Sequence, residues 1–100
     1  MQAQHSGSII AEIDAHMLKS GIANGNWCVG ITSDIEERLF GFHRVPRTNH
    51  WFIYRRALNA AESRAIEAAY HKAGCRGASG GGDDASVYIY AYVIKAQTAE

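Results

Sequence analysis

The basic residues of this chain gather in its middle, where they suggest contact with phosphate groups. Residues 38–76 hold eight basic residues against two acidic ones, a net charge of +6. Residues 1–37 hold one against five, or −4, and residues 77–100 one against three, or −2. This distribution predicts a local phosphate-binding face in a neutral chain, and a solvated surface of mixed charge is the alternative. The candidate nucleic-acid-binding residues are Arg44, Arg47, Trp51, Arg55 and Arg56.

One arginine of this segment, Arg38, follows a predicted strand and the predicted start of a helix. The short apolar run Trp27–Val29 predicts a strand that ends at Gly30, eight residues before Arg38. Ser33 and Glu36 have the spacing of a capping box, which predicts the start of a helix. The apolar stripe of that helix is expected to contain Ile35, Leu39 and Phe42.

The rest of the chain predicts alternating helices and strands in one domain. Hydrophobic periodicity favours helices from Ser8 to the glycine at position 21 and from Asn59 to about Ala73. Aromatic and β-branched runs favour strands at 50–56 and 87–94. We therefore expect an α+β fold in which a three-stranded, mostly antiparallel sheet is flanked by three helices, in the order αβαβαβ. Residues 1–7 are expected to be a disordered lead, residues 8–96 the domain, and residues 97–100 a tail.

Composition narrows the protein class and the expected location. Hydrophobic residues make up 47% of the 100 residues, which is ordinary for one globular domain. No run of about eighteen apolar residues predicts a membrane span, and residues 1–8 do not resemble a signal peptide. We therefore expect a cytoplasmic protein whose two cysteines, Cys28 and Cys75, are reduced. The glycine-rich segment Gly77–Ala85 predicts a loop, and it lacks the lysine of a P-loop.

The order of these features resembles the GIY-YIG nuclease family between Trp27 and about Cys75. The second motif of that family ends in Tyr-Ile-Gly or Tyr-Val-Gly, and the matching triplet here is Cys28-Val29-Gly30. Arg38 matches the family's catalytic arginine on the next helix. Glu67 matches the metal-binding glutamate on a later helix, within a pattern like E-A-x-x-x-E-x-x-x-I.

The resemblance implies a metal-dependent endonuclease, a hydrolase that cleaves phosphodiesters of nucleic acid, with DNA favoured over RNA and with Mg²⁺ or Mn²⁺ bound by Glu67. An arginine neutralises charge on the phosphoryl oxygens, and a divalent ion stabilises the leaving oxygen. One carboxylate with several waters suits magnesium. A tyrosine or a histidine accepts the proton of the attacking water. The candidate catalytic residues are Arg38, Glu67, Tyr88, Tyr90 and His43.

The chain departs from the family in its tyrosines. A helix without tyrosine is predicted where the first motif strand, Gly-Ile-Tyr, belongs, and Cys28 replaces the tyrosine of the second motif. We hypothesise that the strand at 87–94 pairs antiparallel with residues 27–31 and replaces the missing strand, as in a circular permutation. A tyrosine at position 88, 90 or 92 then faces Arg38 and Glu67, and plain sheet packing of these tyrosines is the alternative.

Non-catalytic interpretations exist for the other residues and for the function. Arg38 is also placed for a surface contact with Asp34, and Glu67 for pairing with Arg64 or His71 on an exposed helix face. The alternative function is a catalytically inactive module on the same fold that binds nucleic acid or protein. Self-association as a homodimer through a sheet edge is a further alternative.

Overall fold

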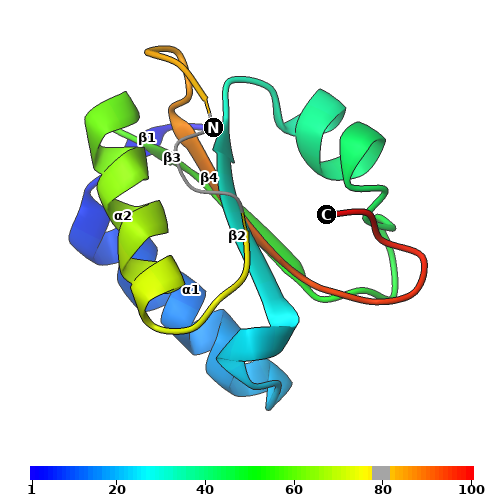
Figure 1. Cartoon of the computed structure of the whole chain (residues 1–100). Helices are drawn as coiled ribbons and strands as arrows, with labels where there is room; N and C mark the ends of the chain where they lie inside the picture. The colour runs from blue at the N-terminus through cyan, green and yellow to red at the C-terminus, as the bar shows by residue number, and fades with distance from the viewer. Residues whose placement is uncertain (78–81) are drawn as a thin grey trace.

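A mixed four-stranded sheet forms the middle layer of the computed structural model, which describes residues 1–77 and 82–100 (Figure 1). The central pair consists of antiparallel strands β3 and β4, with β2 antiparallel on the other side of β4 and the two-residue β1 parallel to β3. The strands, in sheet order, are β1 (Ala3–Gln4), β3 (Phe52–Ala57), β4 (Tyr88–Val93) and β2 (Trp27–Thr32).

The last strand pairs as expected. Gly30 lies opposite Tyr90, and Cys28 lies opposite Tyr92, so β4 runs antiparallel to β2. The alternation of β4 divides its side chains between the two faces of the sheet. Its aliphatic residues join one hydrophobic cluster, and its tyrosines belong to the other. The α+β class is therefore confirmed, with four strands where three were expected.

Helices α1 (Ser6–Ser20) and α2 (Ala60–Lys72) cover one face of the sheet (Figure 1). Ile9 and Ile13 of α1 and Ile66 of α2 are fully or almost fully buried against the aliphatic side chains of the strands. Asn59 starts α2 as predicted, because its side-chain oxygen accepts a hydrogen bond of 2.9 Å from the Glu62 amide. None of the helices in the described ranges has the length and apolar character that a membrane crossing requires.

This cap gives a test of the packing of α2. Asn59→Ala should lower the free energy of unfolding by about 1 kcal/mol, because the Glu62 amide loses its acceptor. Urea denaturation measures the change. Asn26→Ala is the matched control, since no hydrogen bond of its side chain is found within the described residues. Equal losses in the two variants would show that the cap contributes nothing.

The other face of the sheet is covered by η2 (Glu36–Phe42), which is a π-helix (Figure 1). Its helical start lies one residue later than expected, since Asp34 rather than Ser33 accepts from a helix amide, that of Glu37, at 3.1 Å. A π-helix bonds residue i+5 to residue i, and the His43 amide accordingly donates to the Arg38 carbonyl at 3.0 Å.

The wider turn of η2 changes which side chain faces the sheet. The expected stripe of Ile35, Leu39 and Phe42 is wrong in its last member: Phe42 is 51% exposed, whereas His43 is 3% exposed. Each π-turn holds more residues than an α-turn, so the third buried position moves one residue along the chain. The π-turn therefore turns a histidine, instead of a phenylalanine, toward the tyrosines of β4.

Both ends of the chain differ from expectation. Residues 1–7 are not a disordered lead, because Ala3 and Gln4 pair with β3 and the side chain of His5 caps α1. The helix α1 thus begins at Ser6 rather than Ser8. At the other end, the Ala99 amide donates to the His43 carbonyl at 2.8 Å, so the expected tail contacts the domain. Of the glycine-rich segment, residues 78–81 lie outside the described residues.

Candidate active site

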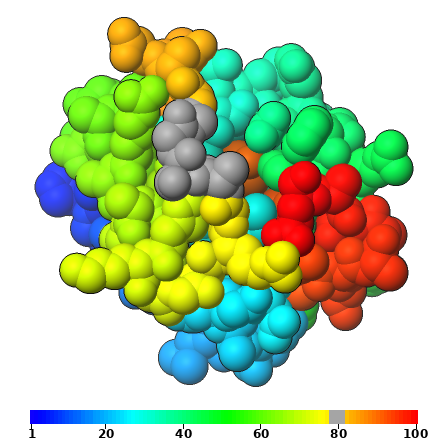
Figure 2. Space-filling model, viewed as in Figure 1, coloured from blue at the N-terminus to red at the C-terminus, as the bar shows by residue number. Residues whose placement is uncertain are grey.

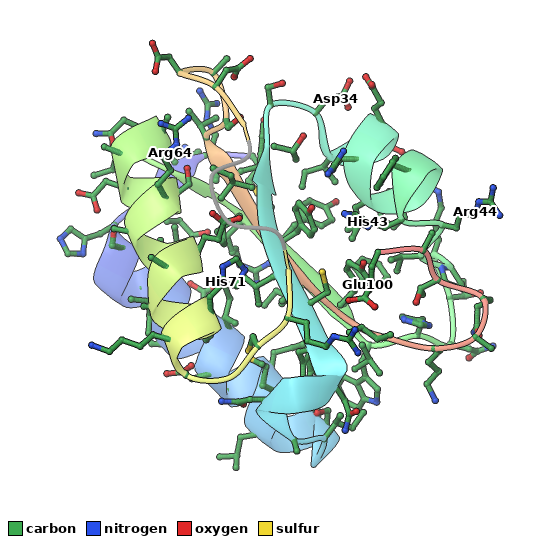
Figure 3. The ribbon with its side chains drawn as sticks, viewed as in Figure 1. Asp34, His43, Arg44, Arg64, His71 and Glu100 are labelled. Atoms are coloured by element: carbon green, nitrogen blue, oxygen red, sulfur yellow. The ribbon has the colours of Figure 1, made fainter. Side chains whose placement is uncertain are left out.

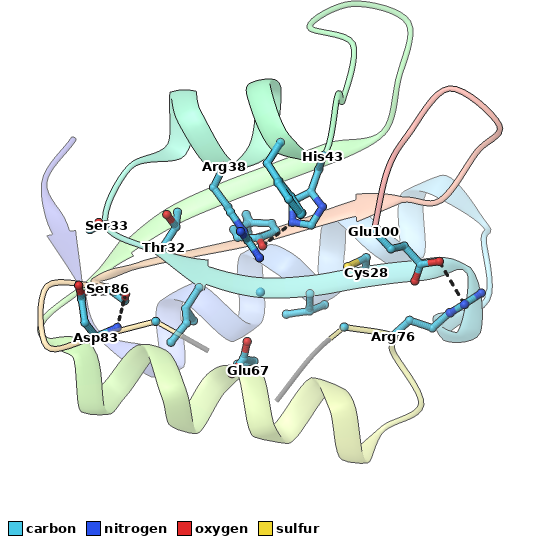
Figure 4. Close-up of a pocket in the computed structure, with 17 residues that line it drawn as sticks. Cys28, Thr32, Ser33, Arg38, His43, Glu67, Arg76, Asp83, Ser86 and Glu100 are labelled. Carbon is cyan, nitrogen blue, oxygen red and sulfur yellow. Dashed lines mark hydrogen bonds and ion pairs between the residues drawn. The ribbon is translucent and has the colours of Figure 1, made fainter. Parts of the chain in front are cut away.

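A pocket of about 800 Å³ lies along the edge strand β2 and gathers most of the predicted catalytic residues. Figure 4 shows Arg38 and His43 on one side of β2 and Glu67 on the other. Tyr90 of β4 also lines the pocket, whereas the half-buried Tyr88 does not. Four of the five residues thus come together from η2 and the residue after it, α2 and β4.

Tyr90 reaches the pocket because the residue opposite it is glycine. The ring of Tyr90 lies over Gly30, and a Cβ atom built on Gly30 would come within 2.5 Å of Tyr90 Cζ. The Tyr90 hydroxyl lies 2.8 Å from His43 Nε2. Burial raises the pKa of Tyr90 to about 12, and the nearby Arg38 guanidinium opposes that rise. Tyr90 is therefore a neutral phenol near pH 7.

His43 has polar partners on both ring nitrogens. Its Nδ1 lies 2.6 Å from the Ala99 carbonyl oxygen and 2.9 Å from the Tyr92 hydroxyl. Burial lowers the pKa of His43 below its ordinary value of 6.5, although the Ala99 carbonyl opposes the shift. The ring is therefore neutral near pH 7 and able to accept a proton. Figure 3 shows His43 inside the molecule, and the next residue, Arg44, directed outward.

Arg38 of η2 lines the pocket on the same side of β2 as His43 (Figure 4). The residue is exposed, and its guanidinium carbon lies 4.2 Å from the centre of the Phe42 ring. Among the described residues no ion pair joins Arg38 to Asp34; the link between them is the Arg38 amide donating to the Asp34 carbonyl at 3.0 Å. The guanidinium is therefore available to an anion in the pocket.

Glu67 contributes a buried carboxyl group from α2. It is only 6% exposed, which contradicts the alternative of an exposed helix face. Within the described ranges no ion pair or hydrogen bond joins it to Arg64 or His71, and His71 Nε2 instead lies 2.8 Å from the Val29 carbonyl. Burial raises the pKa of Glu67, and His71 and Arg64 partly oppose that change. A bound cation would offset the free-energy cost of burying a carboxylate at this position.

Sequence reasoning missed three charged residues that line the pocket: Arg76, Asp83 and Glu100. Arg76 and Glu100 form an ion pair of 3.1 Å at the pocket wall (Figure 4). Arg76 belongs to the basic segment noted above, but no sequence pattern marks Asp83 or Glu100. With Arg38 and Glu67 included, two positive and three negative groups give the lining a formal charge of −1.

The donor groups of the pocket fit magnesium better than a metal with many protein ligands. Among residues 1–77 and 82–100 no group of three or more His, Cys, Asp or Glu side chains is placed to hold a metal. Asp83 Oδ1 accepts from the Ala85 amide at 2.9 Å, which leaves Glu67 as the buried acceptor. One carboxylate with several waters is a common magnesium site. Cys28 also lines the pocket, and burial raises the pKa of its thiol, which favours the neutral thiol near pH 7.

The predicted nucleic-acid-binding residues do not line this pocket. Arg47 pairs with Glu36 and covers the Phe40 ring at 4.0 Å. Arg55 donates to Glu12 of α1 at 2.7 Å, on the sheet face opposite His43. Trp51 packs against the core, with its ring 5.2 Å from that of His16. Arg44 and Arg56 are exposed and form no ion pair with the described residues.

The C-terminal residues complete the wall of the pocket. Figure 2 shows them, in red, against the green residues that include the end of η2. Among the described residues, Glu100 thus lines the pocket together with side chains of η2, α2 and β4, and Ala99 contacts His43 behind it.

Comparisons of the chain with family models, with curated proteins and with solved structures gave no match, so the likeness to GIY-YIG nucleases rests on the sequence motifs alone.

Proposed function

We propose that this domain binds nucleic acid at the pocket on β2 and hydrolyses a phosphodiester there. The observation that carries the proposal is that four side chains from separate segments line one pocket: Arg38, His43 and Tyr90, together with Glu67 from the other side of β2 (Figure 4). Their chemistry is that of charge neutralisation, proton acceptance and cation binding. These are the three needs of phosphodiester hydrolysis by water.

Arg38 and the Tyr90–His43 pair have separate roles in this proposal. The Arg38 guanidinium donates hydrogen bonds to the phosphoryl oxygens as their negative charge grows. The Tyr90 oxygen takes a proton from the attacking water while the Tyr90 hydroxyl proton passes to His43 Nε2, 2.8 Å away. The water becomes the hydroxide nucleophile, and His43 becomes an imidazolium. Neutral His43 is the form that can receive this proton.

Glu67 is the residue that would hold a divalent cation, with waters in the remaining positions. When bound, magnesium or manganese supplies positive charge at the phosphoryl and leaving oxygens. The electrostatics of the lining favour this arrangement. Its formal charge of −1 attracts a cation, and a divalent ion changes the sum to +1, which then attracts phosphate.

Arg38→Ala should lower the rate of cleavage about 10²- to 10³-fold, because a donor to the developing charge is lost. The assay incubates purified protein with single-stranded DNA, duplex DNA and RNA, each with Mg²⁺, Mn²⁺ or EDTA. Lys72→Ala is the control, since Lys72 is an exposed cation outside the pocket. Equal loss in both variants would reject a special role for Arg38. Cleavage that persists undiminished in Glu67→Ala would point to a contaminating nuclease.

Binding without turnover is the second candidate, and the two arginines at the pocket favour it. Both arginines are exposed: Arg38 offers its guanidinium to an anion whether or not chemistry follows, and Arg76 offers the donors that its pair with Glu100 leaves over. This version predicts affinity for nucleic acid that falls steeply with salt and no cleavage with any metal. Fluorescence anisotropy with labelled DNA and RNA measures the affinity at each salt concentration and compares the two nucleic acids. The preference for DNA and a homodimer through a sheet edge stay predictions.

A further inference from the structure

We propose that the backbone carbonyl of Ala99 positions His43, by holding its ring as the tautomer with hydrogen on Nδ1, so that Nε2 accepts the hydroxyl hydrogen of Tyr90. Ala99 is therefore a positioning residue for the pocket and not part of a passive tail. The assignment of the tautomer stands on the contacts of His43 alone. Its consequence for catalysis rests on the proposed function.

The tautomer follows from what each partner of Nδ1 can do. A carbonyl oxygen only accepts hydrogen bonds, and the Ala99 oxygen lies 2.6 Å from Nδ1. Nδ1 must therefore carry hydrogen, since a bare nitrogen would face the carbonyl with two lone pairs opposed. The Tyr92 hydroxyl, 2.9 Å from Nδ1, fits this choice, because it donates its own hydrogen to the Ala99 oxygen at 3.2 Å.

The state of the other ring nitrogen is then fixed. A neutral imidazole has hydrogen on one nitrogen only, so Nε2 is bare and acts as an acceptor. The Tyr90 hydroxyl, at 2.8 Å, is the donor that meets it. With the opposite tautomer, Nε2 would donate to the Tyr90 oxygen and could not receive the Tyr90 proton. The Ala99 carbonyl thus decides the direction of the Tyr90–His43 hydrogen bond.

Three contacts hold the Ala99 carbonyl in its place. The Ala99 amide donates to the His43 carbonyl at 2.8 Å, so the two residues bond each other twice. The turn before Ala99 is closed by the Thr98 amide, which donates to the Lys95 carbonyl at 3.1 Å. Glu100, on the other side, pairs with Arg76. These contacts fix the chain on both sides of the carbonyl.

The charged and titratable groups around His43 do not supply a substitute for Ala99. Arg38 of η2 disfavours a proton on the ring, and Glu100 favours one. The two tyrosines of β4 that touch the ring are neutral, because burial raises the pKa of each. None of these groups is a fixed acceptor at Nδ1, and only the Ala99 carbonyl combines that chemistry with a 2.6 Å contact.

Nitrogen-15 NMR of the histidine side chains tests the tautomer without any substrate, because a bare ring nitrogen resonates far from a protonated one. In the full chain near pH 7, we expect His43 to show a protonated Nδ1 and a bare Nε2. A protonated Nε2 in the full chain would overturn the proposal at once, whatever the variants do. His43→Asn identifies the signals by their loss.

Deleting residues 99–100 should shift His43 toward the Nε2–H tautomer, while Gln97→Ala, at an exposed residue of the same segment that does not line the pocket, should leave the tautomer unchanged. A deletion variant that melts earlier but keeps Nδ1–H would show a merely structural role and reject the proposal. The deletion should also lower cleavage at least about 10²-fold, as expected when a proton acceptor is lost. If the full chain has the expected tautomer and cleaves nothing, the proposed function fails and the positioning role of Ala99 stands. If cleavage survives the loss of the tautomer, the consequence of the Ala99 contact for catalysis is rejected while the tautomer assignment stands.

Discussion

Gly30→Ala is expected to lower cleavage about 10²-fold and the free energy of unfolding by about 1 to 3 kcal/mol. The added Cβ would come within 2.5 Å of Tyr90 Cζ, so the ring must move. Tyr90 sits in the central strand and is 3% exposed, which leaves the ring little room inside the core. Its hydroxyl then leaves its place beside His43 Nε2. The loss of rate therefore follows from a displaced side chain and not from a missing one.

Gly25→Ala is the matched control for this prediction. A Cβ on Gly25 meets nothing within 4 Å, and Gly25 is exposed in the short helix before β2. Cleavage assays and urea denaturation of both variants give the comparison. The control should change the free energy of unfolding by no more than about 0.5 kcal/mol. If Gly30→Ala cleaves like the original chain, Tyr90 does not need its position over Gly30, and its proposed role in proton transfer is excluded.

The sheet that places Tyr90 was predictable from the chain itself. The alternation of aliphatic residues and tyrosines in residues 87–94 identified a strand with two different faces. A second apolar run at 27–31 needed a partner, because two strands alone are marginal in water. The pairing of Gly30 with Tyr90 follows from these two signals together with the register that the core imposes.

The position of His43 was not predictable from periodicity. The stretch from Ile35 to Phe42 fits an α-helical stripe, and its sequence does not signal a π-turn. The helix adopts that turn in the context of the sheet, where His43 finds Tyr90, Tyr92 and Ala99 as partners. The hydrogen bonds that hold His43 in this position join residues more than forty positions apart. Local helix propensity carries no information about such contacts.

The charges of the basic segment, residues 38–76, are likewise changed by contacts with residues distant in the chain. The net charge of residues 38–76 predicts a surface for phosphate, yet Arg55 is bound to Glu12 and Arg47 to Glu36. Each acid precedes the segment in the chain, so the count of charges within the segment did not include it. The carbonyl of Ala99 is harder still to anticipate, because every residue carries a carbonyl and no side chain marks this one.

Glu67→Gln is expected to stabilise the fold near pH 7 and to remove activity. The native structure buries the Glu67 carboxyl and raises its pKa, so the charged form is held at a cost when no cation is present. An amide of the same shape has no charge to desolvate, and the free energy of unfolding should rise by about 0.5 to 2 kcal/mol. Glu37→Gln, on an exposed residue, is the control and should change it by less than about 0.5 kcal/mol.

The pH dependence of this gain has a definite sign. Because the folded pKa of Glu67 lies above the value of 4.5 for an unburied carboxyl, the native state binds more protons than the unfolded state between those two pH values. The original chain therefore gains stability as pH falls through the folded pKa, and the glutamine variant does not. The advantage of Glu67→Gln should be complete above the folded pKa and should vanish below pH 4.5. An advantage that does not depend on pH would mean that packing, rather than charge, separates the two chains.

Divalent cations should reverse the order of stability. A cation that binds Glu67 in the folded state stabilises the original chain in proportion to the logarithm of its concentration, and the glutamine variant loses that ligand. Increasing Mg²⁺ or Mn²⁺ should therefore raise the melting temperature of the original chain alone, as thermal melts can measure.

Cleavage by Glu67→Gln should fall about 10³-fold, since a catalytic metal contributes several kcal/mol and each 1.36 kcal/mol is tenfold in rate. A variant that is more stable without metal, insensitive to metal and inactive would show that the buried carboxyl is kept for binding a cation at the cost of stability. Equal metal responses in both chains would remove Glu67 from the metal site.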